Sequence, residues 1–185
     1  MTLRRIVGGR LSGVSGAMSK LEMLLKDWIW PVAALVISAL MIAIAHAFEQ
    51  FGGLPPCPLC LRQREVYWAL LAMTLTGLAI WKIWPKRRFL VALNVLIGLV
   101  FGVGAVVAAY HAGVEWKVFP PPAGCAAAAM IDPFAVKDLD QSFHVADCTA
   151  APFYILGLSM AGWNGVVSLV LSAISFFAAA ATIRR

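Results

Sequence analysis

The sequence has 185 residues, of which 62% are hydrophobic and 13% are charged, and its mean hydropathy is +0.85. Such a composition is too apolar for an ordinary soluble domain and indicates an integral membrane protein. The net charge of +6 at pH 7 comes from basic residues that gather on one side of the predicted membrane spans, so it does not indicate a nucleic-acid-binding protein.

The first 27 residues predict a disordered cytoplasmic extension, because glycines recur there among polar residues. The segment that follows contains an Ala45-His46-Ala47 pattern, which could mark the end of a cleaved signal peptide. The apolar run from Ile29 onward is longer than the about 7 to 15 residues of a signal peptide, and the segment before it is unusually long. We therefore expect this run to be retained as a membrane helix.

Four apolar runs predict the membrane spans. They cover about residues 28–48, 66–84, 89–110 and 163–183. Each run is about 19 to 22 residues long, enough to cross about 30 Å of hydrocarbon as a helix, and a helix satisfies its own backbone hydrogen bonds in lipid. The predicted fold class is therefore an all-α integral membrane protein, a four-transmembrane-helix bundle over residues 28–185. Two of its connecting loops cover about residues 49–65 and 111–162.

Basic residues predict the orientation of this bundle. Eleven of the 15 lysines and arginines lie in the N-terminal segment, between the second and third spans, or at the C-terminus. Seven of the nine acidic residues lie near the two other loops. By the positive-inside rule, we expect both termini to be cytoplasmic and the loops at 49–65 and 111–162 to be external.

All four cysteines lie in the two external loops, Cys57 and Cys60 in the first and Cys125 and Cys148 in the second. A compartment outside the cytoplasm permits disulfides, and one pair within each loop is the simplest arrangement, although four cysteines allow three connectivities. The simplest role is structural, with the disulfides as staples of the loops. A zinc site is a weaker alternative, because Cys-x-x-Cys supplies half of a tetrahedral ligand set and the chain has no second copy. A c-type haem is excluded because Leu61 stands where its motif needs histidine.

The Cys-x-x-Cys motif fits redox chemistry better than a structural role. Its ring is so short that closing it removes little chain entropy, whereas its two sulfurs can exchange electrons without moving the backbone. The positive end of the second helix, with Arg62 and Arg64 nearby, favours the reactive thiolate. Arg62 could equally anchor the helix at the lipid headgroups, but Arg64 shares a helical face with Cys60 if the helix begins in this segment.

The order and spacing of these features resemble the disulfide bond formation protein B (DsbB) family. The shared features are a Cys-x-x-Cys before the second helix, Arg64 four residues beyond it, Tyr110 and His111 at the end of the third helix, and two cysteines in the second external loop. The resemblance covers about residues 28–183. Vitamin K epoxide reductase homologues also have four helices, but they carry the Cys-x-x-Cys after the loop cysteines, so the order argues against them.

The resemblance implies a bacterial inner-membrane thiol oxidase with its cysteines on the periplasmic side. It would reoxidise a periplasmic DsbA-type dithiol oxidase and pass the electrons to a membrane quinone, either ubiquinone or menaquinone. A DsbA-type partner is a strong oxidant with a reduction potential of about −120 mV, so its reoxidation requires an acceptor of still higher potential, and glutathione is too reducing. A membrane quinone meets this requirement, and a helix bundle can hold it.

The resemblance also implies a role for each cysteine. The Cys125–Cys148 disulfide would receive electrons from the partner through a mixed disulfide at Cys125. Cys148 would then attack Cys57 and liberate Cys60, which would react with the quinone. Arg64 matches the family's quinone-site arginine, whose charge would stabilise the Cys60 thiolate and the negative charge on a reduced quinone oxygen.

His111 matches the family's quinone-proximal histidine, although a histidine beside an interfacial tyrosine could also anchor the helix. His46 and His144 are interpreted as solvated interfacial residues, and Glu115 has no role that the sequence supports. Two alternatives remain open. One is a specialised relative with a dedicated DsbA-like partner, and the other is a non-catalytic membrane scaffold stapled by disulfides.

Overall fold

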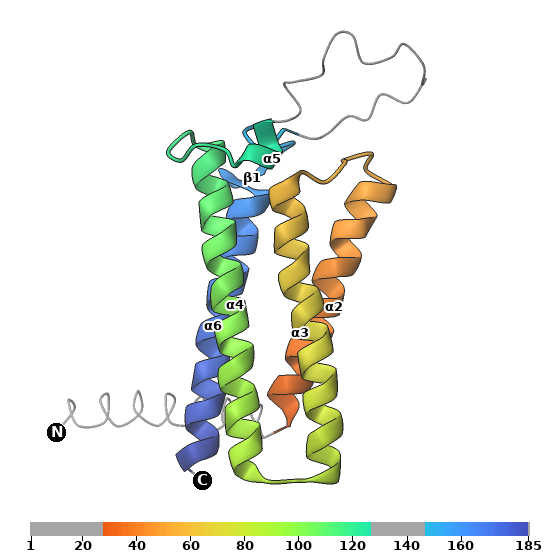
Figure 1. The fold of residues 1–185 in the computed structure, drawn as a ribbon, viewed down its shortest axis with the longest axis vertical. Helices are drawn as coiled ribbons and strands as arrows, with labels where there is room; N and C mark the ends of the chain where they lie inside the picture. The colour runs from red at the N-terminus through yellow and green to blue at the C-terminus, as the bar shows by residue number, and fades with distance from the viewer. Residues whose placement is uncertain (1–27, 127–146, 185) are drawn as a thin grey trace, which may run out of the picture.

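The computed structural model describes residues 28–126 and 147–184, which form one bundle of long helices that run alternately up and down (Figure 1). The long helices are α2 (Ile29–Gln50), α3 (Pro58–Ile83), α4 (Arg87–Glu115) and α6 (Met160–Arg184). The short elements are α5 (Ala123–Ala126), β1 (Tyr154–Ile155) and β2 (Leu158–Ser159). Each long helix is long and apolar enough to cross a membrane, which confirms the predicted four-helix membrane fold. The predicted extension over residues 1–27 and His144 lie outside the described residues.

Helix α3 begins at Pro58, about eight residues before the apolar run that predicted it, because capping and not hydropathy sets its start. Cys57 is the N-cap in extended conformation, and its sulfur accepts a hydrogen bond from the Cys60 backbone N–H at 3.1 Å. Pro58 occupies the first helical position, where its fixed φ suits the helix and its missing N–H leaves no bond unmade. Cys60 therefore lies on the first turn of α3 and not in the loop before it.

Helix α4 is also longer than predicted and ends at Glu115 rather than near residue 110. Ala112 and Val114 of its last turn are buried, and Val114 packs in one cluster with Leu59 and the cysteines. His111 therefore belongs to the helix and is only 4% exposed. These helix ends shorten the predicted external loops, and His111 takes its position from the bundle instead of a loop.

Helices α4 and α6 make the most extensive contact of the bundle. Small residues allow the two backbones to approach closely, as is common between membrane helices. A Cβ added to Gly98 would lie 3.1 Å from the Phe176 ring. The Ser172 hydroxyl donates a hydrogen bond to the Gly98 carbonyl at 2.8 Å. These contacts fix α6 against α4.

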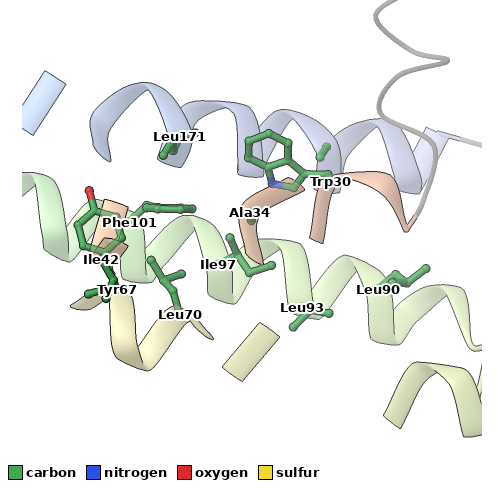
Figure 2. Close-up of a cluster of buried hydrophobic side chains, with 11 residues drawn as sticks. Trp30, Ala34, Ile42, Tyr67, Leu70, Leu90, Leu93, Ile97, Phe101 and Leu171 are labelled. Atoms are coloured by element: carbon green, nitrogen blue, oxygen red, sulfur yellow. The ribbon is translucent and has the colours of Figure 1, made fainter. Parts of the chain in front are cut away.

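A cluster of buried apolar side chains from all four long helices fills the interior (Figure 2). Leu70 of α3 and Ile97 and Phe101 of α4 are fully buried in it. Trp30 of α2 donates a hydrogen bond to the Ser175 hydroxyl of α6 at 3.0 Å. Many large apolar side chains outside this cluster are exposed along the helices, as expected for a surface in contact with lipid.

The end of the bundle with the cysteines also carries α5 and an antiparallel hairpin of β1 and β2 (Figure 1). Leu156 and Gly157 form the hairpin turn, with positive φ values of 52° and 81°, as a type I′ turn requires. Trp163 of α6 donates its indole N–H to the Ile155 carbonyl at 2.8 Å. The α3–α4 turn, the start of α2 and the end of α6 lie at the opposite end.

Candidate functional site

Four side chains along one stripe of α3 form one side of the candidate site. Cys60, Gln63, Arg64 and Tyr67 are spaced i, i+3, i+4 and i+7, so they share one helical face. All four line the same cavity. Because α3 already begins at Pro58, the whole stripe is helical and its side chains have a fixed order along the cavity.

The Cys57 and Cys60 sulfurs are neighbours at the start of α3. They lie 2.7 Å apart, and both residues are free cysteines in this structure. Cys57 is buried and Cys60 is half-buried. Because one capped helical turn already brings the sulfurs together, the pair can pass between dithiol and disulfide with little movement of the backbone.

The negative charge of the singly ionised pair lies on Cys60. The hydrogen bond with Cys60 and burial of the thiol both raise the pKa of Cys57, so Cys57 keeps its proton and donates it toward the Cys60 sulfur. The positive end of α3 and the Arg64 guanidinium, one turn further on, stabilise a thiolate at Cys60. Cys60 is therefore also the better leaving group when a Cys57–Cys60 disulfide is attacked.

Cys125 and Cys148 are joined by a disulfide, with their Cα atoms 5.7 Å apart. Both are buried, and they share one cluster of contacting side chains with Cys57 and with Leu59 and Val114. The two cysteine pairs are thus neighbours in space. This proximity is what thiol–disulfide exchange between them requires.

Arg64 is held in place by α2. Its guanidinium forms an ion pair with Glu49, with an Nη1 to Oε2 distance of 2.5 Å, and Nη2 donates a hydrogen bond to the Ala45 carbonyl at 3.2 Å. The Arg64 side chain is 14% exposed. A guanidinium has five N–H donors, so these two partners among the described residues leave donors for a molecule in the cavity.

His111 approaches the cysteine pair from α4. Its Nε2 lies 3.7 Å from the Cys57 sulfur and 3.8 Å from Glu115 Oε1, and its Nδ1 lies 2.7 Å from Gln63 Nε2. The Glu115 side chain is 4% exposed, and its Oε2 has no hydrogen-bond partner within the described part of the chain. The imidazole therefore connects the Cys57 thiol to polar groups of α3 and α4.

A cavity of about 490 Å³ lies beside these groups and is lined by side chains of all four long helices. Most of its lining is apolar, with Ile42 and Phe48 from α2 and Phe153 from the segment before α6. The thiol of Cys60 and the guanidinium of Arg64 supply polar contacts in it. This volume and lining are typical of a small-molecule site. The donor set fits a flat, apolar molecule with polar oxygens, which is the chemistry of a quinone head group.

A metal ion is the other occupant to consider, because Cys57, Cys60 and His111 offer ligand atoms within 4.8 Å of one another. Two thiolates bound to one zinc ion, each at about 2.3 Å, lie about 3.8 Å apart in tetrahedral geometry. The Cys57 and Cys60 sulfurs are closer than that, at 2.7 Å. The geometry therefore favours a dithiol–disulfide pair over a metal centre.

Four of the predicted site residues line the cavity together: Cys57, Cys60, Arg64 and His111. Arg62 is turned away from it. Its guanidinium lies 2.9 Å from Glu65, and both side chains are exposed. Of the two arginines near the motif, only Arg64 belongs to the site.

Sequence reasoning missed the polar side chains that support these residues. Gln63 contacts His111, and its Oε1 accepts a hydrogen bond from Asn164 Nδ2 at 2.5 Å. The spacing from Cys60 identifies Gln63 once the Cys-Pro pattern is read as a helix start. Asn164 and Glu49 have no such local signal, because only the packing of α6 and α2 brings them to the site.

Comparison with known proteins gives a consistent result. The family model described as "Disulfide bond formation protein DsbB" matches residues 26–178. A disulfide bond formation protein B from a Polaromonas species is 33% identical over 140 residues, covering 72% of this chain and 80% of that protein. One from Paracidovorax citrulli is 32% identical, with 76% and 81% covered. The uncharacterized protein RP370 of Rickettsia prowazekii is 26% identical, with 74% and 78% covered. No solved structure was found to match the chain.

Proposed function

The chain belongs to the disulfide bond formation protein DsbB family, and we propose that it is a membrane thiol:quinone oxidoreductase that reoxidises a periplasmic DsbA-type dithiol oxidase. Family membership supports a multi-pass membrane oxidoreductase with a role in disulfide bond formation. The proposed location is the bacterial inner membrane, with the cysteines on the periplasmic side. One observation carries the proposal: Cys57 and Cys60 line a largely apolar cavity together with Arg64 and His111, and the Cys125–Cys148 disulfide packs in one cluster with Cys57.

In the proposed first step, a thiolate of the partner attacks Cys125. The Cys125–Cys148 bond breaks, a mixed disulfide forms at Cys125, and Cys148 leaves as a thiolate. Cys125 is 5% exposed, so this attack requires the surrounding segment to move. The neighbouring Asp147 carboxylate accepts two hydrogen bonds from Thr149, which lower the pKa of Asp147 and brace the turn at Cys148.

In the second step, the Cys148 thiolate attacks the Cys57 sulfur of a Cys57–Cys60 disulfide and expels Cys60 as a thiolate. The partner's second thiol resolves the mixed disulfide, which releases the oxidised partner and frees Cys125. Cys125 then attacks Cys148 and restores their disulfide, which leaves Cys57 and Cys60 reduced. One dithiol of the partner has been oxidised and one dithiol of this chain has been formed.

The last step returns Cys57 and Cys60 to a disulfide. A quinone in the cavity supplies the oxidising power, since it takes up two electrons and two protons to become a quinol. Cys60 presents its thiolate to the cavity, whereas Cys57 stays protonated because its pKa is raised. Arg64 provides positive charge beside Cys60, where it stabilises developing negative charge in a cavity with a largely apolar lining.

The experiment uses the purified full chain in detergent with lipid. A reduced DsbA-type protein and a soluble quinone analogue are added, and quinone absorbance is followed together with the thiol state of each cysteine. We expect quinone consumption to depend on the reduced partner and to return Cys57 and Cys60 to the oxidised state. Failure of quinone to reoxidise that pair would refute the proposed function.

A further inference from the structure

A continuous chain of polar side chains crosses the bundle beside the cavity and ends at His111. The Tyr67 hydroxyl donates a hydrogen bond to Asn164 Oδ1, and Asn164 Nδ2 donates to Gln63 Oε1 at 2.5 Å. Gln63 Nε2 lies 2.7 Å from His111 Nδ1. Ser168 lies at the far end, with its hydroxyl 3.1 Å from that of Tyr67. The chain joins α3, α6 and α4.

The amide groups give this chain a direction. A side-chain amide nitrogen can only donate, and its oxygen can only accept. Because Gln63 Oε1 is taken by Asn164, its Nε2 faces His111 and must donate to Nδ1. Nδ1 is then an acceptor without a proton, so a neutral His111 carries its proton on Nε2.

The surroundings of Nε2 support the same direction. Its neighbours are the Cys57 sulfur at 3.7 Å and Glu115 Oε1 at 3.8 Å. The Cys57 thiol directs its proton toward the Cys60 sulfur, so the side of Cys57 that faces His111 can accept, as can a carboxylate oxygen. A proton on Nε2 therefore suits both neighbours. His111, Gln63 and Tyr67 are all buried, so water does not compete easily for these positions.

We propose that Gln63, oriented by Asn164 and Tyr67, is a positioning residue that holds His111 in the Nε2–H tautomer, so that an N–H donor and not a lone pair faces Cys57 and the cavity. For its chemical consequence this inference rests on the proposed function. A fixed N–H donor stabilises the negative charge that develops on sulfur or on an oxygen of the electron acceptor, and it needs no reorientation during the reaction. His111 thereby acts as a hydrogen-bond donor instead of a general base.

The most direct test reads the His111 tautomer by ¹⁵N NMR of the full chain in detergent, with only the histidines labelled. The signal is assigned by its loss in His111→Gln. We expect Nε2 to carry the proton in the wild type. Gln63→Met keeps the size of the side chain but removes the donor, so we expect a mixture of tautomers.

Asn164→Asp tests whether a residue that does not contact His111 sets its tautomer through the orientation of the Gln63 amide. Its carboxylate accepts at both oxygens, which forces the Gln63 amide to turn and present Oε1 to Nδ1. The proton is therefore expected to move to Nδ1, although the substituted residue does not touch the imidazole. In both variants, we expect quinone reduction to slow by about 10-fold, as when other histidine-orienting groups are removed, with partner exchange unchanged.

Ser172→Ala is the matched control. Ser172 is a buried residue on α6 whose hydroxyl donates a hydrogen bond to the Gly98 carbonyl, and it does not belong to the row of hydrogen-bonded side chains that ends at His111. It should leave both the tautomer and the rate unchanged. A proton on Nδ1 in the wild type would overturn the proposal. So would an unchanged tautomer in both Gln63→Met and Asn164→Asp. The NMR spectra report the tautomer without any catalytic turnover. If the protein shows the proton on Nε2 but does not reduce quinone, the proposed function is refuted and the inferred tautomer still holds.

Discussion

The two cysteine pairs reach the same end of the bundle by different physical means. Cys57 and Cys60 are brought together by one capped helical turn, so their geometry is local and rigid. Cys125 and Cys148 are separated by 23 positions in the chain, and their disulfide connects segments outside the long helices. The first pair lines a cavity that also contains the Arg64 guanidinium. Under the proposed function, the second pair exchanges with two different disulfides, so the proposal requires a fixed pair for the electron acceptor and a movable pair for the protein substrate.

The largest predicted effect comes from breaking the Cys57–Cys60 pair at the start of α3, called the helical pair below. In Cys60→Ser, we expect quinone consumption to fall to the background rate, because the thiolate proposed to react with the quinone is missing and the Cys57–Cys60 disulfide cannot form. The measurement is quinone absorbance with the reduced partner as electron donor. The Cys125–Cys148 disulfide should still oxidise one equivalent of the partner. Repeated turnover by this variant would contradict the assignment of the two pairs.

Breaking the other pair should stop the relay at an earlier point. In Cys148→Ser, Cys125 is a free thiol that a reduced partner cannot attack, but its thiolate can attack the disulfide of an oxidised partner. The partner's disulfide then breaks, one of its sulfurs leaves as a thiolate, and a mixed disulfide forms at Cys125. Because Cys148 is absent, this protein has no neighbouring thiol to resolve it, so we expect the mixed disulfide to accumulate. Non-reducing electrophoresis and peptide mapping detect it. A partner attached to Cys57 or Cys60 instead would reverse the proposed order of the pairs.

The fixed charge beside the helical pair gives the next largest effect. Arg64→Ala should slow quinone reduction on the order of 100-fold, as expected for loss of a group that stabilises developing charge. Exchange with the partner should be nearly unchanged. Arg62→Ala is the matched control, because that arginine forms an exposed ion pair with Glu65 and such pairs contribute little. Equal quinone kinetics in the two variants would remove Arg64 from the site.

The smallest effect distinguishes the two sulfurs of the helical pair. Because the pKa of Cys57 is raised, its thiolate fraction at neutral pH is below that of an ordinary cysteine and grows about tenfold for each unit that the pH rises. Brief alkylation of the reduced protein should therefore modify Cys60 at least about tenfold faster than Cys57. Mass spectrometry of the labelled peptides measures the ratio across pH 6 to 9. Faster labelling of Cys57 would show that the thiolate lies on Cys57 and would contradict its assignment to Cys60.

Local sequence features predicted the four-helix membrane fold, because apolar runs of spanning length and the need for internal backbone hydrogen bonds are sufficient for it. The same features misplaced the start of α3. The stretch after Pro58 is polar, and hydropathy does not register that Cys57 and Pro58 form a helix start. With that start moved, Cys60 and Arg64 fall on one helical face, as the sequence suggested for a helix beginning there.

The supporting shell of the site could not be predicted in this way. Asn164 is about one hundred residues from Gln63 in the chain, and their hydrogen bond exists only because α3 and α6 both pack against α4, which brings these two side chains within reach of each other. Glu49 reaches Arg64 from α2, and Glu115 reaches the cavity because α4 continues beyond the predicted span. These contacts depend on the relative rotation of helices, which no local pattern in one sequence determines.

The central claim is that Cys57 and Cys60 pass electrons to a quinone, and that this step does not require Cys125 and Cys148. The most direct test is the double variant Cys125→Ser with Cys148→Ser, reduced chemically, freed of reductant and then mixed with a quinone. We predict that Cys57 and Cys60 form a disulfide at a rate close to that of the wild type, with one quinone consumed for each pair. A pair that stays reduced in the variant, while the wild type consumes quinone, would contradict the account.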